Sequence, residues 1–159
     1  MKTFVCRVCS HIAFDQAPID CPVCKAPIEN FVNNNGAIKM PEDPNNLNET
    51  EKKHTPFITV SKECGLISGS CIDVHVKVGE IEHGMESEHY ITFLDFYVNR
   101  KYLARVNLTY KRLHPAAVLH LSKNEGILTV IGNCNAHGSW MAEVNLFRHG
   151  EVEKSEKVA

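Results

Sequence analysis

Five side chains that commonly bind metals, carried by three separated segments, constrain the fold of this chain more than any other feature. The segments EHGMESEHYI and CNAHGSW hold His83, His89, Cys134 and His137, and EKKHTP adds His54. Together they offer four imidazoles and one thiol for a single metal site. Because ligand nitrogens lie ~2.1 Å from a bound metal, the chain must fold so that these segments meet.

The spacing within the two longer motifs predicts irregular backbone. A straight strand would hold His83 and His89 ~20 Å apart, and a helix would place them on roughly opposite faces. The stretch 84–88 must therefore form a loop, and we expect Gly84 to supply its backbone freedom. In CNAHGSW, asparagine, alanine and glycine surround the cysteine and histidine, which is typical of a turn.

The motifs HGMESEHYI, CNAHGSW and KHTP resemble, in order and spacing, those of the superoxide reductases, the neelaredoxin and desulfoferrodoxin family, over roughly residues 51–149. The resemblance implies iron in a plane of His54, His83, His89 and His137, with the Cys134 thiolate axial and the sixth position open. It also implies one-electron reduction of superoxide to hydrogen peroxide, with electrons from a donor such as rubredoxin or a reductase.

Lys52 and Lys53, the two residues that precede His54, bear on how that site works. Lys53 matches the family's active-site lysine, which attracts superoxide and helps to order water for protonation. The family commonly has an iron-binding glutamate at the position of Lys52, whereas Glu51 here lies one residue earlier. Whether Glu51 ligates ferric iron stays open at the level of sequence. The family's proline after the second histidine is replaced by Gly84.

Residues 1–31 form a small unit with two Cys-x-x-Cys pairs, CRVC and CPVC, separated by eleven residues. Two such pairs indicate a tetrahedral four-thiolate site for zinc or iron. CRVCSHIAF and CPVCKAPIENF resemble the rubredoxin-like domain of rubrerythrins, and fusion to a superoxide reductase-like domain favours iron and a role as electron relay. The expected ligands are Cys6, Cys9, Cys21 and Cys24.

Local sequence predicts how this unit continues. Ser10 and Lys25 stand where rubredoxin knuckles usually carry glycine, so we expect a positive φ at non-glycine residues. Residues 32–50 hold six asparagines and two prolines with little apolar periodicity, which is typical of a linker. Nineteen extended residues reach ~60 Å, so the sequence does not require the two modules to touch.

Seven short β-rich runs follow from residue 56 and predict an antiparallel sandwich of immunoglobulin-like type. In IDVHVKV, the apolar residues from Ile72 to Val78 alternate with polar ones, as a half-buried strand requires. Asn99 and Arg100 lie between two runs and predict a hairpin turn. We expect a mainly β chain with a domain at 1–31, a linker at 32–50, a sandwich at 51–149 and a charged tail at 150–159.

The composition narrows the function classes. With 43% hydrophobic and 23% charged residues and a net charge of −2 over 159 residues, the chain suits a globular protein without nucleic acid or membrane as partner. The N-terminus lacks an apolar signal region, so we expect a cytoplasmic location. Cys64 and Cys71 are expected to be free thiols, because disulfides are uncommon in a reducing compartment.

Two other functions fit parts of the sequence: an electron-transfer iron protein, and a structural zinc-binding interaction module. Neither needs a metal with an open position beside a lysine, so superoxide reduction is the favoured hypothesis. Trp140 is expected to anchor the last strand of the core and to border the site. A homo-oligomer formed through a sheet edge stays open.

Overall fold

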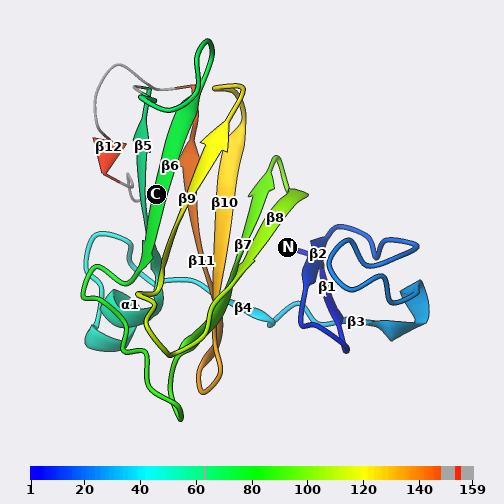
Figure 1. Cartoon of the computed structure of the whole chain (residues 1–159). Helices are drawn as coiled ribbons and strands as arrows, with labels where there is room; N and C mark the ends of the chain where they lie inside the picture. Colours follow the sequence, from blue (N-terminus) through cyan, green and yellow to red (C-terminus); the bar gives the residue numbers. More distant parts are fainter. Residues whose placement is uncertain (63, 148–152, 155–159) are drawn as a thin grey trace.

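Two β-sheets pack face to face, and a smaller three-stranded sheet lies beside them (Figure 1). The structure is a computed structural model that describes residues 1–62, 64–147 and 153–154. Each of the seven β-rich runs expected from the sequence forms a strand. The prediction of a mainly β chain with an immunoglobulin-like sandwich and a preceding rubredoxin-like unit is confirmed.

The sandwich consists of a five-stranded and a four-stranded sheet, in which every pairing is antiparallel except that of β4 with β11. The larger sheet has the order β4 (Ile38–Lys39), β11 (Gly138–Asn145), β10 (Ile127–Cys134), β7 (Ile91–Val98), β8 (Lys101–Asn107). The smaller has the order β12 (Glu153–Lys154), β5 (Pro56–Ser61), β6 (Ile72–Val78), β9 (Ala116–Leu121).

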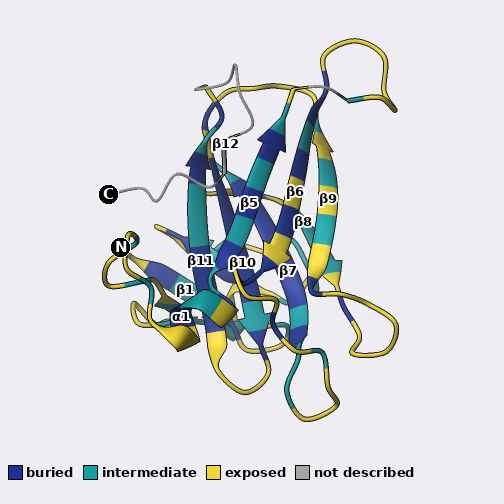
Figure 2. Cartoon of the chain, turned by 90° about the vertical axis from the view of Figure 1, so that its left-hand side faces the viewer, coloured by how far each residue is buried: buried dark blue, intermediate teal, exposed yellow. Residues whose placement is uncertain are grey.

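Alternation along β6 builds the core between the sheets. Ile72, Val74, Val76 and Val78 are all buried, while the residues between them are half-buried or exposed. Figure 2 shows this banding of buried and exposed positions along β6. The buried residues pack against apolar side chains of β7 and β10, such as Leu94. Burial of each such side chain contributes roughly 1.5–3 kcal/mol to folding, which fixes the register that the functional loops inherit.

The predicted hairpin between β7 and β8 is also confirmed. Its two turn residues, Asn99 and Arg100, have φ values of 48° and 63°. Positive φ at both central positions is the geometry of a type I′ turn, whose twist matches that of the flanking strands.

The N-terminal unit is built from β1 (Thr3–Cys6), β2 (Ile12–Phe14), the 3₁₀ helix η1 (Ile28–Asn30) and β3 (Phe31–Asn33), with the sheet order β2-β1-β3. Ser10 and Lys25 have φ values of 61° and 66°, so each knuckle turns through a left-handed non-glycine residue, as expected. Each of these residues donates its backbone N–H to the carbonyl of the first cysteine in its pair, four residues earlier.

The N-terminal unit packs against the sandwich, which the sequence did not require. Ile12 and Phe14 of β2 form one apolar cluster with Tyr97, Ile131 and Met141 of the larger sheet. The Tyr97 hydroxyl donates to the Ile12 carbonyl at 2.8 Å. The two units are therefore held in a defined arrangement (Figure 1).

The segment 32–50 contains ordered structure of its own. β4 pairs in parallel with β11 at Ser139 and Trp140, and α1 (Glu49–His54) begins after the N-cap Asn48. The division of the chain at residues 31, 50 and 149 stays a prediction. The expected charged tail at 150–159 lies outside the described residues, except for the two residues of β12. Among the described residues, no helix is long and apolar enough to cross a membrane.

Candidate metal centre

Four histidines and one cysteine from separate elements meet at one end of the sandwich. His54 is the last residue of α1, and His83 and His89 lie in the loop between β6 and β7. Cys134 ends β10, and His137 lies in the turn to β11. The structure thus brings together all five residues that the sequence selected for this site.

The distances between the side-chain nitrogens fit a single metal ion. The Nε2 atoms of His83 and His54 are 3.2 Å apart, and His137 Nδ1 lies 3.1 Å from His54 Nε2 and 3.0 Å from His89 Nε2. Four nitrogens in a square around a metal, each ~2.1 Å from it, would be about 3.0 Å from their neighbours. The Cys134 Sγ is 3.6 Å from His137 Nδ1, and the ligand atoms of His54, His89, Cys134 and His137 all lie within 4.8 Å of one another.

The four imidazole rings surround the centre of the site at steep angles to their neighbours. Neighbouring rings in the order His54, His83, His89, His137 are nearly perpendicular, with interplanar angles of 74–77°. The rings of His54 and His89, which face each other across the square, are inclined by 31°. This arrangement directs one nitrogen of each ring to a common point without steric overlap.

A capping box fixes the orientation of α1 and therefore of His54. Asn48 Oδ1 accepts from the Glu51 backbone N–H, and Glu51 Oε2 accepts from the Asn48 backbone N–H, each at 2.9 Å. The other oxygen of Glu51 accepts from the Glu42 backbone N–H at 3.2 Å. His54 Nδ1 donates to the Thr50 carbonyl at 2.8 Å, which leaves Nε2 free to bind a metal.

A glycine that the sequence analysis did not select determines the course of the loop from β6 to β7. Gly79 has φ of 89°, and a Cβ there would lie 2.1 Å from the Ile81 carbonyl and 2.8 Å from that of Lys53. Gly84, which we expected to supply the freedom, is not among the residues with positive φ, and a Cβ there would meet nothing within 4 Å. The expected loop is present, but the position that requires glycine is Gly79, five residues before Gly84.

Asn135 holds the two ligand loops together. Its Oδ1 accepts from the Tyr90 backbone N–H at 2.9 Å, and its backbone N–H donates to the Tyr90 carbonyl at 3.1 Å. Its Nδ2 also donates to the Glu88 carbonyl at 3.3 Å. A register shift between Asn133 and Cys134 accompanies this contact, and such bulges re-aim side chains next to functional sites. Asn135 therefore positions His89 relative to Cys134.

Burial keeps part of the site in the neutral form that binds metals. It lowers the pKa of His83 to about 4, and it also lowers that of His54, which the neighbouring histidines and Lys39 reduce further. His83, His54 and Cys134 are buried, whereas His137 is exposed. The site is thus buried on one side and open to solvent on the other.

Two lysines are candidates for a positive charge beside the site. Lys53 is exposed on α1 immediately before His54. Lys39 of β4 donates from Nζ to the His137 carbonyl at 2.8 Å, and its Nζ lies 5.6 Å from the centre of the Trp140 ring. Lys39 could not be predicted from local sequence, because only the pairing of β4 with β11 brings it to the site.

Trp140 forms one wall of the site. It is 7% exposed and stacks on His54, with ring centroids 5.3 Å apart and an interplanar angle of 26°. The expected place in the last strand and beside the metal site is what the structure shows. An aromatic wall of this kind limits water access and orients the imidazole it touches.

The four cysteines of the N-terminal unit form a second candidate metal site. Cys6 Sγ is 3.7 Å from Cys24 Sγ, and Cys9 Sγ is 3.6 Å from Cys21 Sγ. A tetrahedral ion with metal–sulfur distances of ~2.3 Å holds its sulfurs about 3.8 Å apart. A backbone hydrogen bond at Ala26 lowers the pKa of Cys24 to about 7, whereas burial raises that of Cys9.

A buried polar network joins this second site to the sandwich. Arg105 of β8 donates to the Cys9 carbonyl at 2.7 Å and to both oxygens of Asp95 in β7. His11, two residues after Cys9, is buried with Nδ1 3.3 Å from Asp95 Oδ2. A charged residue within the apolar run ITFLDFYV was the one available sequence signal for this contact.

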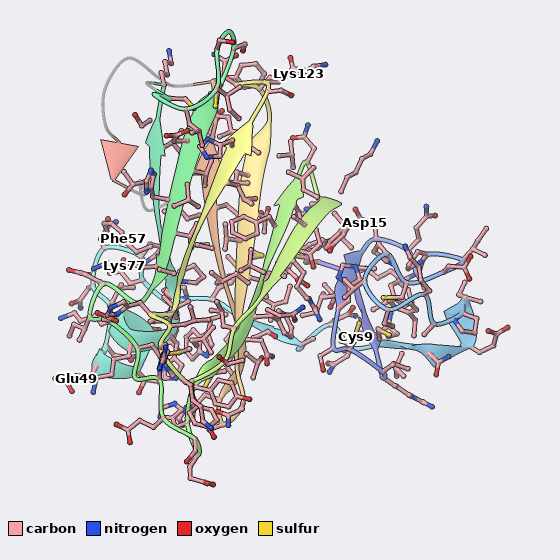
Figure 3. The ribbon with its side chains drawn as sticks, viewed as in Figure 1. Cys9, Asp15, Glu49, Phe57, Lys77 and Lys123 are labelled. Carbon is pink, nitrogen blue, oxygen red and sulfur yellow. The ribbon has the colours of Figure 1, made fainter. Side chains whose placement is uncertain are left out.

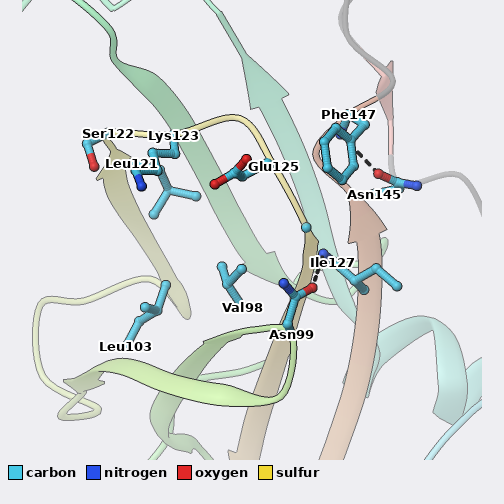
Figure 4. A pocket seen from close by; sticks show the side chains of 11 residues that line it. Val98, Asn99, Leu103, Leu121, Ser122, Lys123, Glu125, Ile127, Asn145 and Phe147 are labelled. Atoms are coloured by element: carbon cyan, nitrogen blue, oxygen red, sulfur yellow. Dashed lines mark hydrogen bonds between the residues drawn. The ribbon is translucent and has the colours of Figure 1, made fainter.

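A pocket at the turn between β7 and β8 does not coincide with either metal site. It is lined by apolar side chains such as Val98 and Leu103, together with Lys123 and Glu125 (Figure 4). Asn99 Oδ1 accepts there from the Ile127 backbone N–H at 3.0 Å. No histidine or cysteine lines this pocket, so we assign it no part in metal chemistry.

Comparison with known proteins bears on both sites. Residues 46–143 match the family model described as desulfoferrodoxin, and residues 4–32 match that of the rubrerythrin rubredoxin-like domain. A putative superoxide reductase of Methanocaldococcus jannaschii is 34% identical over 98 residues, which span 58% of this chain and 81% of the relative. A superoxide reductase of Pyrococcus abyssi is 33% identical over 106 residues, which span 60% and 88%.

Solved structures show the same fold. The superoxide reductase (neelaredoxin) from Ignicoccus hospitalis superposes with a TM-score of 0.53 at 27% identity, covering 69% of this chain and 93% of that one. The superoxide reductase from Nanoarchaeum equitans gives a TM-score of 0.52 at 26% identity, covering 68% and 98%.

Proposed function

Because the chain belongs to the desulfoferrodoxin family, we propose that it is a superoxide reductase. In this reaction one superoxide takes up one electron and two protons and becomes hydrogen peroxide. The observation that carries the proposal is the set of four imidazole nitrogens at metal-ligand spacing beside the Cys134 thiol.

The proposed ligands of the catalytic iron are His54, His83 and His89 through Nε2, His137 through Nδ1, and Cys134 through Sγ. Iron held by this set supplies one-electron redox chemistry, and a thiolate ligand adds electron density to it. These five donors would hold the iron, and the exposed side of the site at His137 would leave it accessible to a small anion.

The residues of the site prepare it before any substrate arrives. Hydrogen bonds from Nδ1 of His54 and His83 to backbone carbonyls fix the tautomer in which Nε2 is free. Burial on the side of His83 and Cys134 excludes water, whereas the exposed side at His137 admits superoxide and the solvent protons that the reaction consumes. No large motion is needed for a diatomic substrate to enter.

We assign the attraction of superoxide to Lys53, with Lys39 as a second cation beside His137. Two positive charges near the open side raise the local concentration of a small anion, and salt screens this effect. Lys53→Ala should slow superoxide capture and weaken its salt dependence, measured by stopped-flow mixing of the reduced chain with superoxide at several ionic strengths. Lys101→Ala, at an exposed position in β8, is the matched control. Equal salt dependence in both variants would remove Lys53 from this role.

The N-terminal four-cysteine site is proposed to hold iron and to relay electrons, and zinc is the alternative there. The donor is proposed to be a rubredoxin or a reductase in the cytoplasm. A homo-oligomer is proposed to form through the exposed edge of β9, which pairs only with β6 among the described strands.

The decisive experiment is to mix the anaerobically reduced, iron-loaded chain with superoxide. We expect one hydrogen peroxide for each superoxide consumed, without release of oxygen. Cys134→Ser should abolish the thiolate charge-transfer absorption of the histidine-rich centre and most of the superoxide reduction, while the spectrum of the four-cysteine centre is unchanged. Cys64→Ser, which removes a thiol far from the site, is the control.

Three results would contradict the proposal. Full activity in Cys134→Ser would mean that another residue is the thiolate ligand. Electron exchange with redox partners, but no consumption of superoxide by the wild-type chain, would favour an electron-transfer protein. Zinc alone at both centres after iron-replete growth would favour the structural module.

A further inference from the structure

A third cluster of metal-binding side chains lies outside both centres described above. One potential ligand atom from each of Cys64, Cys71, Asp73 and His120 lies within 4.8 Å of all the others. His120 Nδ1 is 3.4 Å from Cys64 Sγ and 3.5 Å from Cys71 Sγ, and Cys71 Sγ is 3.7 Å from Asp73 Oδ1. From the sequence, Cys64 and Cys71 are expected only to be free thiols.

Three of the four residues lie in the smaller sheet or directly beside it. Asp73 of β6 and His120 of β9 are direct cross-strand partners, so their side chains project from the same face of the smaller sheet. Cys71 precedes Asp73 by two residues and therefore lies on that face too. The face points away from the core, because the alternate residues Ile72 and Val74 are buried.

The fourth residue, Cys64, lies in the loop between β5 and β6. Cys64 Sγ accepts a hydrogen bond from the backbone N–H of Ile67 at 3.4 Å, three residues later in the chain. An N–H directed at sulfur in this way stabilises a thiolate. Gly69, with φ of 91°, turns the chain back toward β6, and Ser70 Oγ donates to the Ser122 carbonyl beyond β9 at 3.0 Å.

The cluster lies at the opposite end of the sandwich from the histidine-rich centre. Cys71 immediately precedes β6, whereas the loop that carries His83 follows its other end, and seven residues of strand span about 20 Å. Figure 3 shows Lys123, next to Ser122, at one end of the sandwich and Glu49 of α1 at the other. The two sites can therefore be changed independently.

We propose that Cys64, Cys71, Asp73 and His120 form a structural zinc site. Two thiolates, one imidazole and one carboxylate are a ligand set that suits Zn²⁺, which prefers four-coordinate tetrahedral binding in closed sites. A tetrahedral zinc ion would separate its sulfur and nitrogen ligands by about 3.5 Å, which matches the distances from His120 to both cysteines. The Asp73–His120 distance of 2.7 Å must widen by about 0.6 Å, to the roughly 3.3 Å that separates nitrogen and oxygen ligands of tetrahedral zinc.

Zinc at this position would join the loop of Cys64 to the ends of β6 and β9. The loop offers little apolar anchorage, because Leu66 is 78% exposed and Ile67 is 48% exposed. A metal bond from Cys64 would supply the attachment that packing does not. This role is structural and does not depend on the superoxide reductase activity.

The test uses the full chain, with both iron centres loaded, kept reduced and anaerobic, and titrated with Zn²⁺. We expect one zinc per chain in addition to two irons, with X-ray absorption showing two sulfur and two nitrogen or oxygen ligands. Cys64→Ala and His120→Gln should each weaken zinc binding by at least roughly 100-fold. Loss of an outer-shell partner alone can cost that much, and these residues are proposed direct ligands. His75→Gln, on the same exposed face of β6, is the matched control and should bind zinc normally.

Three outcomes would overturn the proposal. These are equal zinc affinity in the cluster variants and the control, no zinc uptake by the wild-type chain with both thiols reduced, and a Cys64–Cys71 disulfide that persists under reducing conditions. Superoxide reduction measured in parallel should be unchanged in Cys64→Ala and His120→Gln. Cys64 is half-buried in a loop, so its truncation leaves the core intact and the result interpretable.

Discussion

Glu51 and Lys52 are adjacent in α1, and the Glu51 side chain has a defined structural role. Both carboxylate oxygens of Glu51 accept backbone N–H groups, from Asn48 and Glu42, and the residue is 6% exposed. A carboxylate committed to these donors is not free to swing toward the iron ligands. The pattern Asn-x-x-Glu at residues 48–51 was readable in the sequence as a capping box.

The resulting prediction concerns Lys52, which occupies the place of the family's glutamate. A protonated lysine cannot ligate iron, so the oxidised site should bind added azide or cyanide readily. Lys52→Glu should introduce a carboxylate that competes with azide and changes the ferric spectrum. We expect azide binding to weaken by about 10-fold, an order-of-magnitude value for one competing ligand. Azide titration of the oxidised wild-type and variant chains measures this.

Glu51→Ala is the control for that experiment. It should leave the ferric spectrum unchanged and lower the free energy of unfolding by about 1 kcal/mol, because it removes half of the capping box. A ferric spectrum that changes in Glu51→Ala but not in Lys52→Glu would contradict the assignment and make Glu51 the sixth ligand.

At the scale of elements, backbone hydrogen bonds join the loop from β6 to β7 to the end of α1. Gly79 donates its N–H to the Thr55 carbonyl at 3.2 Å, and the Ile81 N–H donates to the Lys52 carbonyl at the same distance. These bonds set the separation between His54 and His83. The close approach of backbone at Gly79 is what permits them.

Gly79→Ala should therefore damage the metal site from outside it. The new Cβ would meet backbone oxygens that cannot rotate away, and a positive φ costs alanine more than about 1 kcal/mol. We expect a lower midpoint of thermal unfolding and weaker iron binding at the histidine-rich centre. Gly84→Ala, with nothing within 4 Å of its Cβ, should change the free energy of unfolding by less than about 0.5 kcal/mol. Equal effects of the two substitutions would contradict this account of the loop.

The elements differ in how far the sequence could predict them. Strict alternation located β6, and the β-rich runs located the other strands of the sandwich, because local periodicity reports burial. Motif spacing identified the residues of the histidine-rich site, but not which ring nitrogen of each would face the centre. The proximity of Asp73 to His120 depends on the register between β6 and β9, and no local pattern encodes a register between strands far apart in sequence.

At the scale of the whole molecule, the N-terminal unit is part of the folded body. Asp95 is 1% exposed, and Arg105, His11 and Tyr97 surround its carboxylate. An unpaired charge at this depth would be costly, so the network holds the unit at one place on the larger sheet. Removal of residues 1–47 would also uncover the apolar cluster around Tyr97 and Met141, so truncation is a poor test of the relay.

The network also provides a short covalent and hydrogen-bonded route between the two centres. Arg105 links the carbonyl of Cys9 to Asp95, and Asp95 pairs with Ile131 of β10. Ile131 lies three residues before Cys134 in the same strand, which is about 10 Å along its length. The route begins at a ligand of one proposed centre and ends at the thiolate of the other.

We therefore expect electron transfer from the four-cysteine centre to the histidine-rich centre to occur within one chain. After one equivalent of superoxide oxidises the histidine-rich centre of the fully reduced protein, the four-cysteine centre should become oxidised at a rate that does not depend on protein concentration. Arg105→Lys keeps the buried positive charge but cannot bridge Asp95 and the Cys9 carbonyl with a planar fork, so it should slow this step without slowing superoxide capture. Lys101→Ala in the same strand should leave both rates unchanged. A rate proportional to protein concentration would instead place the transfer between separate chains and remove the role of this interface.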